Sequence, residues 1–177
     1  MRRRRISFGR GFSGPAGIVL LVLLSVGALF SRVAPPPVPS SAAPDGADTG
    51  LVTRVVDGDT IHVLLNGRDY TVRYIGMDTP ETVAPGRPVE AFGKEASQRN
   101  KELVDGKTVT LEKDVSENDR FGRLLRYVYV DGEMVNATLV KEGYATSSTF
   151  PPDVKHQQLF LQLEREARAA KRGLWGK

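Results

Sequence analysis

Residues 51–76 read LVTRVVDGDTIHVLLNGRDYTVRYIG, a stretch in which short runs of β-branched residues alternate with turn residues. Asp57-Gly58-Asp59 and Asn66-Gly67 are typical of hairpin turns, because these residue types tolerate the positive φ that tight turns need. The alternation therefore predicts three consecutive strands joined by hairpins. The expected strands are Leu51–Val56, Thr60–Leu65 and a third that runs from Tyr70 toward Gly76.

The chain beyond this stretch is predicted to contain both strands and helices. Its hydrophobic periodicity predicts the helix Val89–Val104, the strands Thr108–Lys113 and Leu124–Val130, and the helices Asn136–Glu142 and Val154–Lys171. In the first helix, the core-facing side chains are expected to be Phe92, Ala96, Leu103 and Val104. Because strands come in runs with the helices segregated from them, the predicted fold class is α+β, mainly β. Five short strands are enough for a small closed barrel.

The first 50 residues are predicted to lie outside this domain, which we place at residues 51–177. In segment 1–32, five arginines precede an uncharged run of 21 residues from Gly11 to Ser31. This is the pattern of an export signal, but about 20 residues also span a bilayer, so an uncleaved membrane anchor fits equally well. Residues 33–50 are rich in proline and small residues and are predicted to form a disordered linker. The protein is therefore expected to be exported, either secreted or tethered to the outer side of the cytoplasmic membrane.

The formal net charge of +4 does not describe the predicted domain. Six of the 25 basic and two of the 21 acidic residues lie in segment 1–48, so residues 49–177 carry 19 of each sign. The domain is therefore not a bulk polycation that coats phosphate backbones, and any nucleic-acid function must come from a local site. The absence of cysteine excludes a disulfide scaffold, a zinc-thiolate site and a cysteine nucleophile.

Four local features carry side chains that could do chemistry. They are Asp57-Gly58-Asp59-Thr60, Arg73, Asp78-Thr79-Pro80-Glu81 and Arg120-Phe121-Gly122-Arg123. Each alone has a structural explanation, such as a hairpin turn, a helix start or a solvated turn. The first does not fit a calcium-binding EF-hand loop, because His62 stands where glycine is needed and Arg68 where a bidentate glutamate is needed. An arginine in an apolar strand is not left unpaired, so Arg73 either reaches water or lines a polar cleft.

Together, these carboxylates and arginines fit a site that cleaves phosphodiesters. The barrier to phosphate-ester hydrolysis must fall by about 20 kcal/mol, whereas one positioned donor or base supplies only about 3–5 kcal/mol. A metal ion, an activated water and at least two cationic donors are thus the minimal set. The hard oxygens of Asp59 and Asp78 suit Ca²⁺, and arginine binds phosphoryl oxygens in a bidentate manner. A Ser-His-Asp arrangement stays open, although neither His62 nor His156 is accompanied by a Gly-x-Ser-x-Gly motif.

In their order and spacing, the four features resemble the staphylococcal nuclease (thermonuclease) family. Residues 131–137 (DGEMVNA) and 139–143 (LVKEG) also look like this family, so the likeness covers residues 51–175. The resemblance implies an OB-fold, with a five-stranded barrel and three helices. It also implies an enzyme that cleaves DNA and RNA with little sequence demand and leaves 3′-phosphate ends. Nothing in the sequence requires a dimer, so a monomer is expected.

The resemblance also implies a role for each site residue. Asp59, Asp78 and the main-chain carbonyl of Thr79 would hold Ca²⁺, and Asp57 would lie behind these ligands. Glu81 would act as general base on the attacking water. The two side chains that would bind the phosphate and stabilise the charge that grows on it in the transition state are Arg73 and Arg123.

One departure from the family concerns the bound nucleotide. In the family, two tyrosines after the second helix contact it, whereas the matching stretch here, Tyr144–Pro151, has Phe150 as the only aromatic residue close to that place. Phenylalanine can stack on a base but cannot donate a hydroxyl hydrogen bond. The alternative interpretation is an inactive OB module that binds nucleic acid or serves as a scaffold. An inactive descendant has no reason to keep both aspartates together with Arg73, Glu81 and Arg123, which favours the enzyme.

Overall fold

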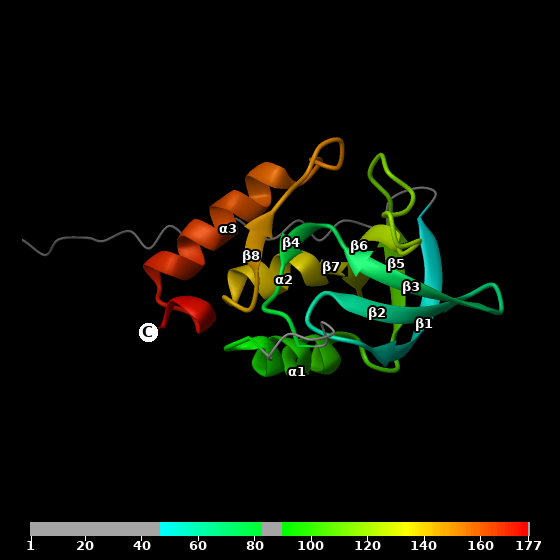
Figure 1. Ribbon diagram of the computed structural model, residues 1–177, viewed down its shortest axis with the longest axis horizontal. Coiled ribbons are helices and arrows are strands. Elements are labelled where there is room, and N and C mark those ends of the chain that lie inside the picture. Colours follow the sequence, from blue (N-terminus) through cyan, green and yellow to red (C-terminus); the bar gives the residue numbers. More distant parts are fainter. Residues whose placement is uncertain (1–46, 83–89, 177) are drawn as a thin grey trace, which may run out of the picture. The chain divides into compact units, whose positions relative to one another are not determined.

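A computed structural model describes residues 47–82 and 90–176, which form the predicted domain (Figure 1). The expected signal or anchor at 1–32 and most of the expected linker lie outside the described residues. Strand β1 (Asp48–Val55) begins three residues before the expected start, so the last residues of segment 33–50 are already paired in the sheet. Among the residues that the structure describes, no helix is long and apolar enough to cross a bilayer.

Five strands form a closed barrel, which confirms the predicted α+β, OB-like fold. They are β1, β2 (Thr60–Leu65), β3 (Arg68–Tyr74), β5 (Thr108–Glu112) and β6 (Leu124–Val130). Neighbours in the order β3-β2-β1-β5-β6 pair antiparallel, and a parallel pairing of β3 with β6 closes the barrel. Strand β1 pairs with β2, with a register shift between Val52 and Arg54, and its first half also pairs with β5.

Three short strands were not expected from the sequence. They are β4 (Gly76–Asp78), β7 (Glu133–Met134) and β8 (Thr146–Ser148). The expected third strand does not continue to Gly76, because the chain bends at Ile75 and restarts as β4 with Gly76 at φ +83°. A side chain at Gly76 would also collide with Phe160. Strand β4 pairs with β8 in a separate two-stranded ribbon beside the barrel.

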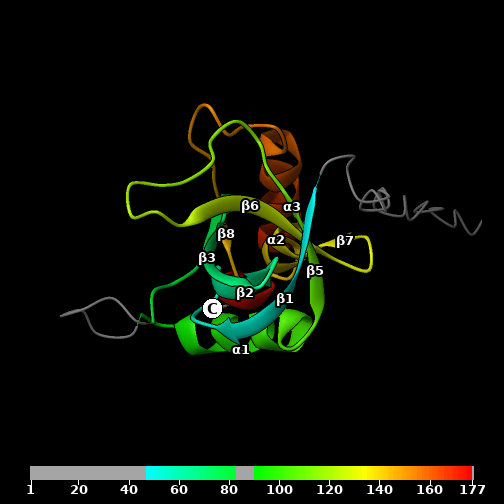
Figure 2. The same ribbon diagram turned by 90° about the vertical axis from the view of Figure 1, so that its right-hand side faces the viewer.

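Three α-helices cover the barrel, as expected: α1 (Gly93–Val104), α2 (Val135–Lys141) and α3 (Gln157–Ala169), followed by the short turn η1 (Gly173–Trp175). Helix α1 packs along β1 at the bottom of Figure 2, whereas α3 packs on α2 and the β4–β8 ribbon. The expected start of the first helix at Val89 is wrong. Residues 90–92 are not helical, because Phe92 adopts φ +73°, and its ring stacks on Tyr144 rather than in the core.

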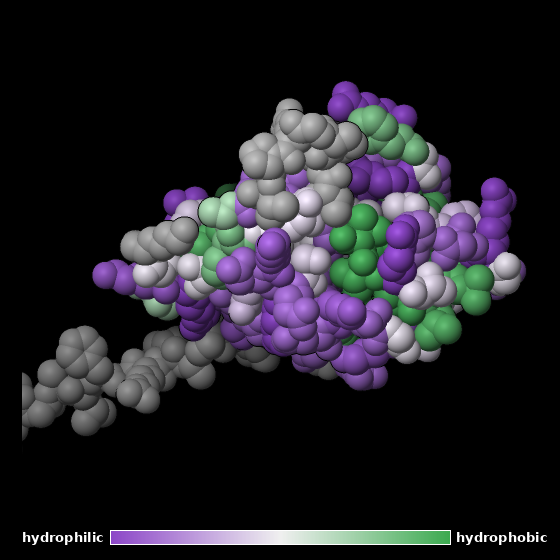
Figure 3. Space-filling view, turned by 60° about the horizontal axis from the view of Figure 1, so that its bottom comes forward, coloured by the Kyte–Doolittle hydropathy of each residue, from purple (hydrophilic) through white to green (hydrophobic). Residues whose placement is uncertain are grey.

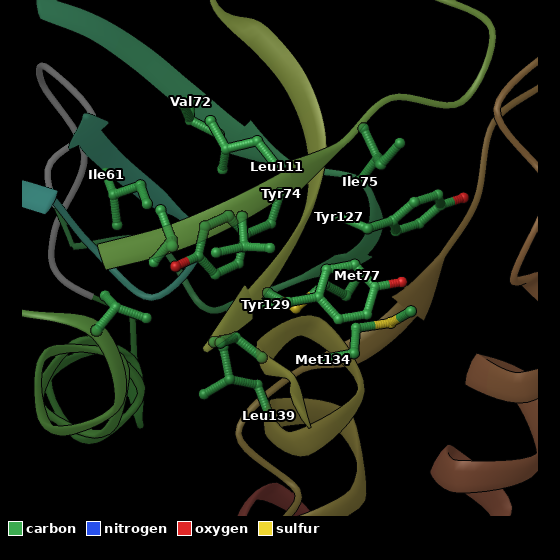
Figure 4. Packing of buried hydrophobic residues seen from close by; sticks show 14 of the residues in the cluster. Ile61, Val72, Tyr74, Ile75, Met77, Leu111, Tyr127, Tyr129, Met134 and Leu139 are labelled. Carbon is green, nitrogen blue, oxygen red and sulfur yellow. The ribbon is translucent and has the colours of Figure 1, made fainter. Parts of the chain in front are cut away.

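The hydrophobic core fills the barrel and continues under α2 (Figure 4). Ile61, Val72, Tyr74 and Leu111 are almost completely buried, in agreement with the alternation along their strands. Figure 3 shows a face that is mostly hydrophilic, on which apolar side chains gather in separate patches, one of them to the right of the centre. The barrel thus has a continuous core, and the ends of its strands are the places where polar side chains can gather.

Candidate active site

Arg73 lies at the centre of the acidic residues singled out in the sequence. It projects from β3, and its Nη1 contacts Asp59 Oδ1 while its Nη2 donates to Asp78 Oδ1 at 2.5 Å. The side chain is 22% exposed, so one side of the guanidinium still faces solvent. Of the two possibilities for Arg73, the structure therefore shows the polar cleft.

Asp59 is held by main-chain and hydroxyl donors at the turn between β1 and β2. Its Oδ2 accepts hydrogen bonds from the Thr79 N–H at 3.2 Å and the Thr79 hydroxyl at 3.1 Å, and its Oδ1 accepts one from the Thr60 hydroxyl at 3.0 Å. Gly58 permits this close approach, because a Cβ there would lie 2.6 Å from Thr79 Oγ1. The predicted metal ligands Asp59 and Thr79 are thus brought together.

Asn100 of α1 holds the same turn in place through hydrogen bonds. Its side chain is buried on α1, where the amide donates to the Asp57 carbonyl at 2.9 Å and the amide oxygen accepts the Tyr74 hydroxyl at 2.9 Å. Asp57 Oδ1 in turn accepts the Asp59 N–H at 3.1 Å. The Asp57 side chain therefore supports the turn from behind Asp59, and α1 fixes the turn relative to the barrel wall.

The charges around Asp59 are unbalanced. Burial raises its pKa to about 7, the Arg73 charge opposes this rise, and the nearby carboxylates of Asp57 and Asp78 add to it. Asp59 and Asp78 thus share one guanidinium, and the Asp57 carboxylate lies behind Asp59. A group of this composition is short of positive charge, and a bound cation would relieve that shortage.

Arg123 is the residue directly before β6, whose first residues pair with β3, the strand that carries Arg73. Asp119 holds it in place, because Asp119 Oδ2 accepts hydrogen bonds from Arg123 Nε at 2.6 Å and lies 2.6 Å from Nη2, while Oδ1 accepts the Arg123 N–H at 3.0 Å. Burial alone would raise the pKa of Asp119, but the hydrogen bonds from Arg123 and from the main chain outweigh it and keep this pKa below its usual range. Asp119 is therefore a stable anion that orients Arg123.

A cavity of about 350 Å³ connects these groups. Its polar walls include Arg73, Asp78, Asp119 and Arg123, and Phe150 closes one side. Phe150 is 73% exposed, so its ring can meet a planar group that enters the cavity. Two arginines that line one cavity beside a carboxylate pair have the chemistry to bind a phosphate group.

The loops that carry Arg123 and Phe150 are joined to each other. Asp153 is buried and its Oδ1 accepts the N–H groups of Val115 at 3.0 Å and Ser116 at 2.8 Å. Burial would raise the Asp153 pKa, but these N–H donors and the Ser116 hydroxyl outweigh it and lower the pKa. The two loops are therefore coupled in position, although they are far apart in the sequence.

Glu81 is placed differently from the other predicted site residues. It is not part of the cavity wall. Its Oε1 accepts the Thr82 N–H at 3.0 Å, and its main chain pairs with Glu90, which follows residues 83–89 outside the described part. Gly93 allows this segment to approach α1, because a Cβ there would lie 2.9 Å from the Pro80 carbonyl. The base role of Glu81 thus stays a prediction.

The residues present fit a divalent cation by their donor chemistry. Asp59 and Asp78 offer carboxylate oxygens and Thr79 a main-chain carbonyl, which are the ligands that hard cations such as Ca²⁺ prefer. Among the described residues, no three acidic or histidine side chains form a metal-binding group by themselves. A cation here would therefore complete its coordination with water or with the phosphate.

Asp119 and Asn100 were not singled out in the sequence. A signal for Asp119 was available, since an aspartate before the turn residues Phe121 and Gly122 is the usual acceptor for N–H groups two to four residues on. Asn100 gave no such signal, because its partner Asp57 is 43 residues away.

Comparison with known proteins places this site in a family. The model of the staphylococcal nuclease homologue family matches residues 71–177, which is more than half of the chain. The chain belongs to the staphylococcal nuclease family. It is 38% identical over 160 residues to a thermonuclease of Staphylococcus intermedius, a match that spans 90% of this chain and 95% of the relative. The thermonuclease of Staphylococcus hyicus is 44% identical over 127 residues (72% and 75% of the two chains).

Endonuclease YncB of Bacillus subtilis, another relative, is 47% identical over 126 residues, which is 70% of this chain and 60% of that protein. The staphylococcal nuclease resemblance inferred from four short motifs is thus confirmed.

Proposed function

We propose that this member of the staphylococcal nuclease family is an endonuclease that hydrolyses phosphodiester bonds of DNA and RNA with little sequence preference. Relatives named thermonuclease and endonuclease support a nuclease of the micrococcal type. The observation that carries the proposal is the cavity that Arg73 and Arg123 both line, together with Asp78. The wall offers charge for a phosphate rather than a set of groups that would read base edges, which fits weak sequence demand.

Both arginines would bind the phosphate and stabilise the charge that develops on it in the transition state. Arg73 is bound on one side to Asp59 and Asp78, and Arg123 is bound to Asp119, so both guanidinium groups are oriented before substrate arrives. A positioned donor of this kind contributes about 10²- to 10³-fold to the rate when it stabilises charge that develops in the transition state. Two of them supply a large part of the acceleration, and a general base supplies more.

We assign the base role to Glu81 and the cation to Ca²⁺. Asp59, Asp78 and the Thr79 carbonyl would hold the cation, which supplies Lewis-acid charge at the phosphate when bound. Glu81 follows Thr79 by two residues, and its segment is held against α1, which supports a position near the cation ligands. Attack by a water that Glu81 activates, with departure of the 5′-oxygen, would leave a 3′-phosphate.

The purified chain should be incubated with single-stranded DNA, duplex DNA and RNA in a chelator, in Ca²⁺ and in Mg²⁺. We expect cleavage of DNA and RNA in Ca²⁺ and none in the chelator. A polymerase needs a free 3′-hydroxyl group, so it should extend the products only after a phosphatase has removed their 3′-phosphate. Binding without cleavage in Ca²⁺ would instead identify an inactive nucleic-acid-binding module.

We also propose that the enzyme works as a monomer outside the cytoplasm. The export part of this proposal rests on the arginines and the apolar run of segment 1–32, which lies outside the described residues. Fractionation of cells that express the whole chain should recover it in the medium or on the membrane, and protease added to intact cells should digest the membrane-bound form. A protein found only in the cytosol would contradict export.

A further inference from the structure

A second cavity lies on the other side of Arg123. It has a volume of about 480 Å³ and is lined by the beginning of β3 and by the loop that precedes β6. These segments meet because β6 starts opposite Val72 of β3, so the residues before each pairing lie side by side (Figure 1). Arg123 lines both cavities, so a ligand that passes this side chain would occupy both.

Two aromatic rings and two guanidinium groups line this second cavity, and a third guanidinium, that of Arg120, packs on one of the rings without lining the cavity. Arg68 lies over the Tyr70 ring at 5.3 Å, and Arg120 and Arg123 lie over the Phe121 ring at 4.7 and 5.6 Å. Phe121 is 69% exposed, which is unusual for a phenylalanine that serves only packing. Rings of this kind offer flat surfaces on which a nucleobase can stack.

The charges at the second cavity favour an anion. Its two acidic wall residues already have partners, since Asp69 lies 2.6 Å from His62 Nδ1 and Glu117 contacts Arg126. By contrast, neither Arg68 nor Arg120 forms an ion pair with any other residue that the structure describes. In a domain with equal numbers of acidic and basic residues, Arg68 in the wall of the second cavity and Arg120 next to Phe121 in that wall are local positive charge.

We propose that this second cavity binds the single-stranded nucleic acid adjacent to the scissile phosphate. A neighbouring base would stack on Tyr70 or Phe121, and Arg68 would contact the next phosphate. The volume falls in the range of about 300–1,000 Å³ typical of pockets that hold small ligands. Stacking needs a base that is free of its own helix, so the cavity favours single strands over duplexes. The inference rests on the nuclease function proposed above.

The test uses the whole chain and the variants R68A and Y70L. Arg68 is exposed, so its removal should not disturb the barrel; leucine at position 70 keeps apolar packing but removes the ring. R165A is the matched control, since it removes an equal charge from the exposed side of α3, outside both cavities. Substrates are single-stranded oligothymidylates of two to sixteen nucleotides.

For the unchanged chain and for R165A, we expect kcat/KM to increase with oligonucleotide length. In R68A and Y70L this gain should shrink by about 5- to 100-fold, the range found when one base–aromatic or phosphate contact is lost. An equal gain with length in R68A and the unchanged chain would overturn the proposal. If Y70L reduced kcat/KM on duplex DNA as much as on single strands, the stacking part of the proposal would be overturned, because a duplex offers no free base.

A binding measurement without cleavage tests the second cavity independently of the proposed nuclease function. Fluorescence anisotropy with labelled dT12 in chelator measures strand binding without cleavage. R68A should weaken binding about 5-fold or more and reduce the slope of log Kd against log salt by about 0.7, whereas R165A should do neither. If the unchanged chain cleaves nothing but shows this pattern, the nuclease proposal fails and the cavity stands. If it cleaves and R68A binds normally, the cavity proposal fails.

Discussion

Replacement of Asp119 by asparagine tests whether Arg123 works because it is held in place. Asp119 Oδ2 makes two contacts of 2.6 Å with the Arg123 guanidinium, and Oδ1 accepts the N–H groups of Phe121 and Arg123 at 2.9 and 3.0 Å. In D119N one oxygen can still accept the main-chain N–H groups. The new NH₂ group cannot accept from the guanidinium, so Arg123 loses the contacts that orient it.

The expected size of the effect follows from these contacts. The pair is partly exposed, with the side chains of Arg123 and Asp119 29% and 16% accessible, so its loss should destabilise the fold by only about 1 kcal/mol. Removal of Arg123 itself should cost about 10²- to 10³-fold in kcat, the usual value of one transition-state donor. Because D119N leaves the arginine present but unoriented, we expect a loss of about 10- to 100-fold in kcat.

The assay is a double-mutant cycle with D119N, R123A and D119N/R123A, measured in single-turnover cleavage of single-stranded DNA. If Asp119 acts through Arg123, D119N should slow R123A by less than about 3-fold. D105N, which removes a surface charge at the end of α1, is the control and should leave kcat unchanged. Thermal unfolding of each variant confirms that the fold is retained. A D119N loss that is equally large in the R123A background would refute the positioning role.

Three further predictions concern other parts of the enzyme. E81Q should slow cleavage about 10²- to 10⁴-fold with little change in strand binding, and unchanged turnover would remove Glu81 from the base role. F150A should raise KM for single strands about 5-fold or more, and F150Y should not, since either ring can stack. Burial would raise the pKa of Glu112, but hydrogen bonds from Lys155 and Tyr129 and the His156 charge keep it below the usual 4.5. The stabilisation by Glu112 is therefore present above about pH 4.5 and is lost as pH falls through the lowered pKa, so in urea unfolding E112Q should be less stable than the unchanged chain at pH 7, and this difference should be smaller at pH 3.

The barrel was predictable because its signals are local. Asn66-Gly67 and Asp131-Gly132 do adopt positive φ at both residues, as hairpin turns of this kind require, and the alternation along β2 and β3 matches their buried faces. The missed strands β4, β7 and β8 have only two or three residues each. Such short strands have no periodicity of their own and exist because of a distant partner, as where Gly76 pairs with Ser148.

The site residues likewise fall into those that could be predicted from the sequence and those that could not. The acidic residues Asp59 and Asp78 lie next to recognisable turn and strand patterns, so their side chains could be singled out before any contact was known. Their common partner Arg73 could be suspected because a charge in an apolar strand needs compensation. What could not be predicted is the set of supports: Asn100 and Asp153 act on main-chain groups about 40 residues away in the sequence.

The two walls of the phosphate cavity differ in how firmly the fold holds them. Arg73 sits on the barrel strand β3, Asp78 sits on the paired strand β4, and Asp59 behind them is buried and bonded to Thr79, so this wall cannot shift without breaking strand pairing. Arg123 and Phe150 belong to loops whose link to each other is Asp153. Since locally stabilised loops open at a lower free energy than core strands, the loop wall can adapt to different nucleotides while the strand wall keeps the phosphate in register. The weak sequence preference that we propose needs both properties at once, because every base must be accepted and every phosphate must be held in the same place.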